Sequence, residues 1–388
     1  MKKRKIAVVT GTRAEYGILR PLLEKIKKSV FFELLLIVTG MHLLEEYGMS
    51  IREIEEDGFL INAKVMMYKR EDPEILYHGR ALARGVKGFT EVLSEMDPDV
   101  LVVIGDRLEP LAAALAASTL NIVIAHIHGG DKTDSGHIDE SIRHSITRFS
   151  HIHFTATKSH TERLIKMGEE PWRIFEVGAL ALDSVVNCEK FIPREELFPK
   201  LGISLKNSKV IVCVFHPVHL ERESAREQIG EIMNTLEELK IESVVIYPNN
   251  DGGSKDIIKE IERYKNLPFI KIFPNLSHSE YISLLKCADV LIGNSSSGII
   301  EAPSIGLPVV NIGSRNTGRE HADNVIFVDA EREKIEEAIK VALYDEEFVE
   351  RARKCKNPYG DGRTSERIVD VLSKITIDKK LLRKKITY

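Results

Sequence analysis

The chain has 388 residues, of which 43% are hydrophobic and 29% are charged, and its net charge is −4. This length exceeds what one ordinary hydrophobic core supports, so we expect two domains. The near-neutral charge argues against a dedicated nucleic-acid-binding protein, although one locally basic cleft would still suit an anionic small molecule.

Short β-branched runs alternate with helical patterns through the first half of the chain. These runs are 5–11, 31–40, 99–106, 121–130, 151–157 and 173–179. They are almost wholly apolar, which is typical of strands buried on both faces of a parallel sheet. Between the first two runs, Leu19, Leu22, Leu23 and Ile26 recur at helical spacing and predict one buried helix face.

The same alternation restarts in the second half, with runs at 209–217, 242–249, 269–275, 289–296 and 308–313. Two successive βα series predict an α/β protein with two doubly wound, Rossmann-like parallel-sheet domains. We place the first domain at 1–182 and the second at 183–363, because 183–207 holds two prolines and no clean strand. We expect the last helix, within 364–388, to return to the first domain.

The cysteines and the N-terminal residues indicate the compartment. Cys188, Cys213, Cys287 and Cys355 form no CxxC pair, so they predict neither a disulfide framework nor a zinc site. The apolar run at 6–9 is too short for a signal peptide, and no stretch reaches the length of a membrane span. We therefore expect a cytoplasmic protein with no membrane partner.

Polar residues follow nearly every predicted strand. Ligands bind beyond the carboxyl ends of the strands in open α/β sheets, so we expect a ligand cleft between two facing domains. In the first half these residues are Thr10, Gly11, Thr12, Arg13, Glu15, Gly40, His42, Asp106, Arg107, His126, His128 and Asp131, with Asp139, Arg143 and His144 just beyond. In the second half they are His216, Asn249, Asn275 and 294–297.

Several of these residues have a purely structural alternative. The segment GTRAEYG lacks the GxGxxG dinucleotide pattern, and Arg13 suits either a phosphate or the protein surface. In GDR, Asp106 beside Arg107 suits either chemistry or a salt bridge that holds a loop. His126 and His128, at i and i+2, should share one face of a strand; this is a weak metal signal, and contact with phosphate or proton transfer is the better interpretation.

The segment NSSSG at 294–298 follows a predicted strand and precedes a predicted helix. A capping side chain satisfies only one of the free N–H groups at a helix start, so capping does not explain four polar residues. Hydroxyls and unpaired N–H groups at the positive end of a helix form an anion site. Glu301, one to two turns into that helix, suits a ribose diol or is an ordinary helix glutamate. His216, followed by Pro217, is either a ligand contact or a core histidine.

The motifs form an ordered set over nearly the whole chain: GTRAEYG, TGMH, GDR, HIHGGD, IDESIRHSITR, FHP, YPNNDGGS, IGNSSSGIIEAP and NIGSRNTGRE. Together they closely resemble the hydrolysing UDP-N-acetylglucosamine 2-epimerases of sialic and legionaminic acid biosynthesis, which have the GT-B superfold. The non-hydrolysing epimerases are more distant, because their GTRPE and HVEAG patterns are replaced by GTRAE and HIHGG. The resemblance implies a UDP-sugar bound between the domains, with UDP mainly on the second.

The resemblance also assigns roles. The UDP-binding candidates that it implies are Arg13, Arg107, His216, Asn249, Ser295, Ser296, Glu301 and Arg315. We add Asn275, because it follows a predicted strand. Asp106 and Asp139 match acidic positions implicated in acid–base work. His128 replaces a glutamate used by some members, which leaves His128, Asp131 or Glu15 for that role. The remaining candidates, for the sugar or phosphate shell, are His42, Arg143 and His144.

The implied reaction eliminates UDP across C1–C2 of UDP-N-acetylglucosamine to 2-acetamidoglucal, which then adds water to give N-acetylmannosamine. Removing the C2 proton needs a base, and the departing diphosphate needs cations and hydrogen-bond donors. No cofactor or metal is required, and a homodimer or homotetramer is expected. The alternatives are the same reaction on UDP-2,4-diacetamido-2,4,6-trideoxyglucose, a GT-B glycosyltransferase, or a UDP-sugar sensor.

Overall fold

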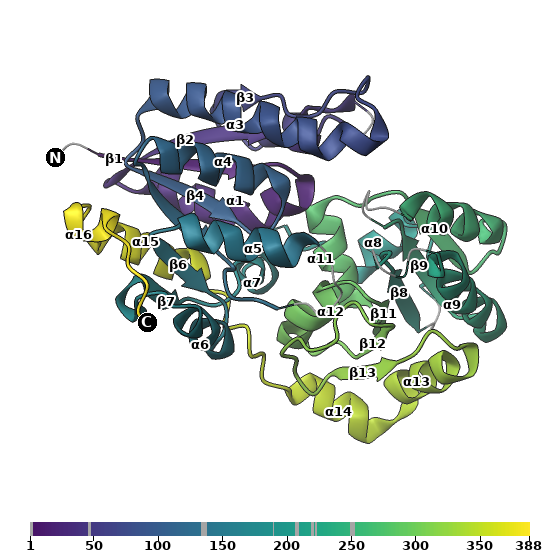
Figure 1. The fold of residues 1–388 in the computed structure, drawn as a ribbon. Coiled ribbons are helices and arrows are strands. Elements are labelled where there is room, and N and C mark those ends of the chain that lie inside the picture. Colours follow the sequence, from purple (N-terminus) through teal and green to yellow (C-terminus); the bar gives the residue numbers. More distant parts are fainter. Residues whose placement is uncertain are drawn as a thin grey trace. The chain divides into compact units, whose positions relative to one another are not determined.

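The structure, a computed structural model, describes residues 3–45, 48–132, 138–188, 190–205, 209–218, 221, 223–248 and 253–388. The chain forms two compact units, which are described separately below (Figure 1). The first unit contains the residues up to Asp131, Ile138–Ser184 and Gly362–Tyr388, and the second consists mainly of Val185–Asp361. In the described part of the chain, no helix is long and apolar enough to cross a membrane.

The first unit is built on a seven-stranded parallel sheet in the order β3-β2-β1-β4-β5-β6-β7 (Figure 1). Its strands are β1 (Arg4–Thr10), β2 (Phe32–Thr39), β3 (Ile61–Val65), β4 (Val100–Ile104), β5 (Val123–Ile127), β6 (Ile152–Thr155) and β7 (Ile174–Glu176). Every residue of β4, β5 and β6 is buried, which explains why these segments are continuous apolar runs.

Helices cover both faces of this sheet. They are α1 (Arg13–Lys28), α2 (Ile51–Glu56), α3 (Tyr77–Met96), α4 (Leu108–Thr119), α5 (Ile138–Phe149), α6 (Lys158–Lys166), α7 (Ala181–Val186), α15 (Thr364–Lys374) and α16 (Lys379–Leu382), with 3₁₀ turns η1 (Gly40–Leu43), η3 (Glu74–Leu76) and η4 (Pro171–Arg173). One core includes α1 and α15, and the other includes α3, α4 and α5. The four apolar residues predicted to share a face of α1 are all fully buried in the first core, which confirms that prediction.

The C-terminal helices are tied into the first unit by two buried charges. The Asp183 carboxylate accepts hydrogen bonds from the N–H groups of Thr364 (2.8 Å) and Ser365 (2.6 Å) at the start of α15. The fully buried Arg173 guanidinium donates to the carbonyl oxygens of Leu381 (2.6 Å) and Lys380 (3.1 Å) in α16. In Figure 1 the yellow helices α15 and α16 accordingly lie with the purple and blue elements.

The second unit has a six-stranded parallel sheet in the order β10-β9-β8-β11-β12-β13. Its strands are β8 (Val210–Val214), β9 (Glu242–Ile246), β10 (Ile270–Phe273), β11 (Val290–Gly293), β12 (Val309–Ile312) and β13 (Val325–Val328). Its helices are α8 (Arg194–Lys200), α9 (Ala225–Leu239), α10 (Ser254–Ile261), α11 (His278–Cys287), α12 (Ser297–Ile300), α13 (Arg332–Tyr344) and α14 (Glu346–Lys354), with η6 (Glu262–Tyr264) and η7 (Ala302–Ile305). Two such sheets confirm the predicted fold class.

Candidate functional site

The turn after β1 positions the first acidic candidate, Glu15. The Thr12 hydroxyl caps α1 by accepting the Glu15 N–H (3.2 Å), and Glu15 Oε2 accepts the Gly11 N–H (2.8 Å). Burial, together with the negative charge of Glu109, raises the pKa of Glu15 to about 7, although Arg107 and the Gly11 N–H act in the opposite direction. A carboxyl group with a pKa near neutrality is suited to giving and taking a proton.

Arg143 on α5 organises a second group of acidic residues. Only 2% of the residue is exposed, yet its guanidinium reaches three partners. Nε donates to Asp106 Oδ2 (3.1 Å), Nη2 bonds the same oxygen, and Nη1 donates to the Asp131 carbonyl oxygen (3.1 Å) and pairs with Glu140. Burial alone would lower the pKa of Arg143, but the carboxylates of Asp106 and Asp131 raise it above its ordinary value. Arg143 therefore stays charged and holds Asp106 in place.

The turn after β5 differs from the expectation for its two histidines. The strand ends at Ile127, and His128 lies beyond it with φ +67°, so the prediction that His126 and His128 share one strand face is wrong. The left-handed conformation redirects the chain before the second imidazole. His128 Nε2 accepts the Leu180 N–H (3.1 Å), and burial lowers the pKa of His128 to about 4, so the ring is neutral at pH 7.

His126 is occupied within the protein. Its Nδ1 lies 3.2 Å from the Thr147 hydroxyl and its Nε2 2.8 Å from the Gly105 carbonyl oxygen, and burial lowers the pKa of His126 to about 3. His126 thus supports the loop that carries Asp106. Among the residues that the structure describes, no three His, Cys, Asp or Glu side chains are grouped as metal ligands would be.

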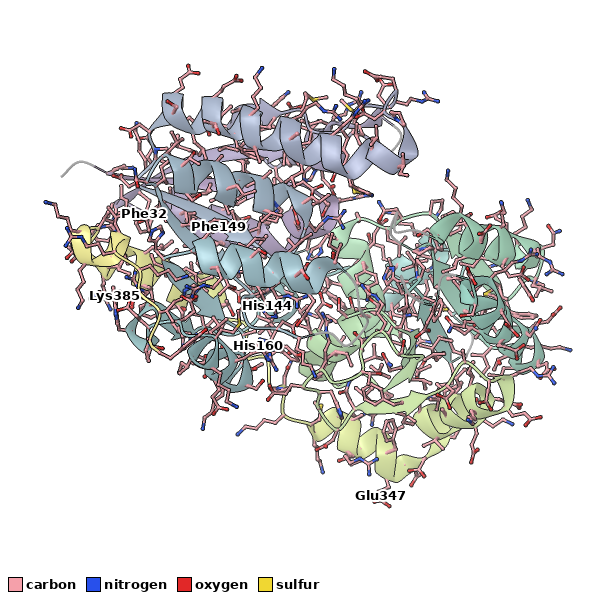
Figure 2. The ribbon with its side chains drawn as sticks, viewed as in Figure 1. Phe32, His144, Phe149, His160, Glu347 and Lys385 are labelled. Carbon is pink, nitrogen blue, oxygen red and sulfur yellow. The ribbon has the colours of Figure 1, made fainter. Side chains whose placement is uncertain are left out.

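The remaining acidic and histidine candidates of the first unit lie on α5 and beside it. Asp139 is half-buried in the first turn of α5, one turn before Arg143. His144 Nε2 lies 2.9 Å from Glu140 Oε1, and Asp131 Oδ1 lies 3.3 Å from His160 Nε2 on α6. Figure 2 labels His144 and His160. Arg143 therefore gathers Asp106, Asp131 and Glu140, and Glu140 and His160 are residues that the sequence analysis missed.

Two basic candidates and one histidine have partners inside the first unit. Arg13 makes a two-point ion pair with Glu53, with Nε to Oε2 at 2.8 Å and Nη2 to Oε1 at 3.1 Å. Arg107 Nε lies 3.5 Å from Glu109 Oε2. His42 is fully buried between the hydroxyls of Thr10 (3.0 Å) and Ser50 (2.8 Å) and its burial lowers its pKa to about 4, so it supports the turn as a neutral group.

The turn after β11 joins two strand ends of the second unit. The buried Asn294 side chain accepts the His216 N–H (2.7 Å) and donates to the His216 carbonyl oxygen (2.8 Å). Gly293 has φ +114°, and a Cβ there would meet the Val214 carbonyl oxygen at 2.1 Å. Only glycine allows this close approach, so the NSSSG segment is fixed against the end of β8.

The backbone of this turn offers hydrogen-bond donors. Within the described ranges, the N–H groups of Ser295 and Ser296 have no hydrogen-bond acceptor, and both residues are partly exposed. The N–H of Ser297 is weakly satisfied by Ser295 Oγ (3.3 Å). Adjacent unpaired N–H groups beside hydroxyls are an anion-binding arrangement.

The sequence predicted Glu301 one to two turns inside a helix, and the structure shows that this prediction is wrong. Helix α12 has only four residues and Glu301 is its C-cap, because Pro303 follows in the 3₁₀ turn η7. The short helix has a weak dipole, so anion binding at this turn depends on N–H groups and hydroxyls. Burial raises the pKa of Glu301, while a hydrogen bond from Ser297 lowers it.

Of the other candidates in the second unit, Arg315 and His216 lie beside the NSSSG turn, whereas Asn275 and Asn249 are not placed there. Arg315 Nη1 donates to the Asn294 carbonyl oxygen (3.0 Å), and Asn316 Nδ2 donates to the same oxygen (3.1 Å). Burial and the charge of Arg315 lower the pKa of His216 well below its ordinary value. Asn275 is exposed in the loop after β10, and Asn249 lies outside the described residues.

Two α/β units, each built on one parallel sheet, are the architecture of the GT-B class of protein. The family model described as UDP-N-acetylglucosamine 2-epimerase matches residues 24–373. The chain belongs to this family.

Similar proteins agree with this assignment. The "UDP-N,N'-diacetylbacillosamine 2-epimerase (hydrolyzing)" of Legionella pneumophila is 39% identical over 381 residues, covering 98% of each chain. The "UDP-N-acetylglucosamine 2-epimerase" of Neisseria meningitidis serogroup B is 34% identical over 372 residues, covering 95% of each chain. In fold, the chain is similar to the crystal structure of a Neisseria meningitidis UDP-GlcNAc 2-epimerase bound to UDP-GlcNAc, with a TM-score of 0.81, 21% identity and coverage of 96% of this chain and 100% of that one.

Proposed function

We propose that the protein is a hydrolysing 2-epimerase, which converts a UDP-2-acetamido sugar and water into the free C2-epimeric sugar and UDP. The observation that carries this proposal is the acidic group around the buried Arg143, which holds Asp106 in the turn after β4, and β4 pairs with β5, whose following turn carries the neutral His128. Such a group is suited to removing a weakly acidic proton and to delivering one.

In the first step a base removes the C2 proton while the C1–O bond breaks and UDP leaves. We assign the base role to Asp106 or Asp139, as the family positions suggest. In the second step water adds its hydroxyl to C1, and a proton reaches C2 from the opposite face. The protonated carboxyl of Glu15, the imidazole of His128 or the carboxyl of Asp131 is the candidate donor for this proton.

The second unit supplies the leaving-group site. The N–H groups of Ser295 and Ser296, which have no acceptor among the residues that the structure describes, suit diphosphate oxygens, and Glu301 suits the ribose hydroxyls. Arg315 adds positive charge next to the same turn. Stabilisation of the departing diphosphate by donors and cations accounts for bond breaking without a metal ion.

We favour UDP-2,4-diacetamido-2,4,6-trideoxyglucose, also called UDP-N,N'-diacetylbacillosamine, as the substrate. The sequence alone ranked UDP-N-acetylglucosamine first. The relative named for the diacetamido sugar is 39% identical, whereas the Neisseria relative named for UDP-N-acetylglucosamine is 34% identical. UDP-N-acetylglucosamine is therefore the second candidate.

The test is NMR of the products formed from each UDP-sugar in heavy water. The proposal expects free sugar with inverted C2, deuterium at C2 and one UDP for each sugar, with a higher kcat/KM for the diacetamido substrate. Intact nucleotide sugar with inverted C2 would identify the non-hydrolysing reaction. Turnover that requires an added acceptor would identify a glycosyltransferase, and binding without turnover a UDP-sugar sensor.

A further inference from the structure

A fully buried carboxylate lies directly beneath the candidate site of the first unit. Glu109 is in the first turn of α4 and is 0% exposed. Its Oε1 accepts the Tyr68 hydroxyl (3.0 Å), and its Oε2 lies 3.5 Å from Arg107 Nε without forming a hydrogen bond. Burying a carboxylate oxygen that makes an ionic contact but no hydrogen bond costs free energy of folding. Such a group therefore calls for a structural or functional explanation.

Glu109 also contacts the turn that carries Glu15. A Cβ on Gly11 would lie 2.9 Å from Glu109 Cγ, and a Cβ on Gly40 would lie 2.9 Å from Glu109 Oε1. The other face of the same turn donates the Gly11 N–H to Glu15 Oε2. One glycine therefore lies between two carboxyl groups, of which Glu109 is fully buried and Glu15 is half-buried.

From this geometry, we propose that Glu109 is a positioning residue: its charge orients Arg107 and keeps Glu15 protonated as a proton donor near neutral pH. The proposal rests on the hydrolysing epimerase function, because the donor role concerns hydration at C2.

The charged groups around the pair support this division of roles. The partners of the Glu109 carboxylate are the Arg107 guanidinium and the Tyr68 hydroxyl. The groups that act on Glu15 are Glu109 and Asp106, which raise its pKa, and Arg107, which lowers it. Two like charges on either side of one glycine repel each other, and this repulsion favours the protonated form of Glu15.

The test variant is Glu109→Gln, which keeps the size and the Tyr68 contact but removes the charge. In ¹³C NMR of protein with labelled glutamate carboxyl groups, Glu15→Gln identifies the resonance that titrates near pH 7 in the wild type. We expect Glu109→Gln to move this titration downward by on the order of one pH unit. The same shift should appear in the pH profile of kcat, and Glu109→Asp should restore much of it.

The matched control is Glu91→Gln on α3, an exposed glutamate whose Oε1 lies 3.9 Å from Lys87 Nζ. It should leave both the titration and kcat unchanged. An unchanged Glu15 titration in Glu109→Gln would overturn the proposal. If Glu109→Gln does not fold, Arg107→Gln tests the same charge arrangement, because the loss of this positive charge should raise the pH at which Glu15 titrates.

The NMR titration does not depend on turnover. If neither UDP-sugar is turned over while the coupled titration is present, the pair exists but its assigned reaction is wrong. If turnover occurs and no glutamate titrates near neutrality, the function stands and the role of Glu109 is wrong.

Discussion

Asp106 meets Arg143 through a single carboxylate oxygen, and this contact makes it the most informative residue to change. We expect Asp106→Asn to lower kcat by roughly 10²–10⁴-fold, because the amide cannot act as a base and the buried Arg143 loses a charged partner. UDP affinity, which we attribute to the second unit, should change by less than about threefold. The measurements are steady-state kinetics and calorimetric titration with UDP. Normal turnover in Asp106→Asn would show that another residue is the base.

Buried neutral histidines make the first unit sensitive to acid. His42 has a folded pKa of about 4 because of burial, well below its unfolded value, so the native state binds fewer protons than the unfolded state between these values. Its contribution is complete above about pH 6.5 and is lost as the pH falls toward 4.

The measurement is urea unfolding at pH 7 and pH 5, followed by Trp172 fluorescence. We expect the wild type to lose on the order of 2 kcal/mol per neutral buried histidine over this interval, and His42→Gln to lose correspondingly less. The exposed His78 provides the control, since His78→Gln should keep the wild-type dependence. An equal loss in wild type and His42→Gln would show that His42 is not responsible.

At the level of single residues, the sequence predicted which positions meet but not which contacts they make. Residues that follow strands, such as Asp106 and Asp131, are brought together by Arg143, since the carboxyl ends of neighbouring parallel strands share one edge of the sheet. Glu109 was missed because it was counted as part of an apolar helix. A lone carboxylate in the otherwise apolar start of α4 was the available signal. The sequence carried no signal for the left-handed backbone at His128, because histidine does not require that conformation.

At the level of elements, apolar runs predicted every strand that the sheets bury on both sides. The two missed strands, β3 and β13, both lie at sheet edges and are mostly half-buried, so their sequences INAKV and VIFV lack a long apolar run bounded by turn residues. The length of α12 was overestimated for a different reason. Periodicity continued into 302–305, but the proline at 303 tightened that turn into 3₁₀ geometry.

The β11–α12 turn gives a prediction at this level. Gly293→Ala places a Cβ 2.1 Å from the Val214 carbonyl oxygen at φ +114°, so β8 and β11 must separate. We expect a loss on the order of 2–4 kcal/mol in the free energy of unfolding, measured by circular dichroism in urea, and weaker UDP binding.

Gly230→Ala on α9 is the matched control for this change. A Cβ at Gly230 meets no heavy atom within 4 Å and lies within a regular helix, so it should stabilise the second unit by about 0.5–1 kcal/mol. If both variants were equally tolerated, the turn would not be fixed as the contacts indicate.

At the level of the whole molecule, each unit has its own pair of hydrophobic cores, and a buried carboxylate ties distant parts of the sequence into the first. Asp183 binds the N-terminus of α15, about 180 positions further along the chain. The sequence indicated a chain break before this helix but not its partner, because an aspartate in the first turn of a helix and a Thr-Ser pair are individually common. The two were recognisable as a cap only in three dimensions.

Asp183→Asn should therefore destabilise the first unit specifically. The amide keeps one acceptor but turns an N–H₂ group toward backbone donors, at a cost on the order of 2 kcal/mol in the free energy of unfolding. Trp172, the single tryptophan of the chain, reports on this unit, since its ring lies 4.2 Å from the Arg173 guanidinium and 4.7 Å from Lys380 Nζ. The urea midpoint by fluorescence should fall, while UDP affinity is kept. The control is Asp370→Asn, an exposed change in α15 that removes only an i,i+4 ion pair with Lys374. It should shift the urea midpoint little. Equal shifts in the two variants would show that Asp183 does not secure the C-terminal helix.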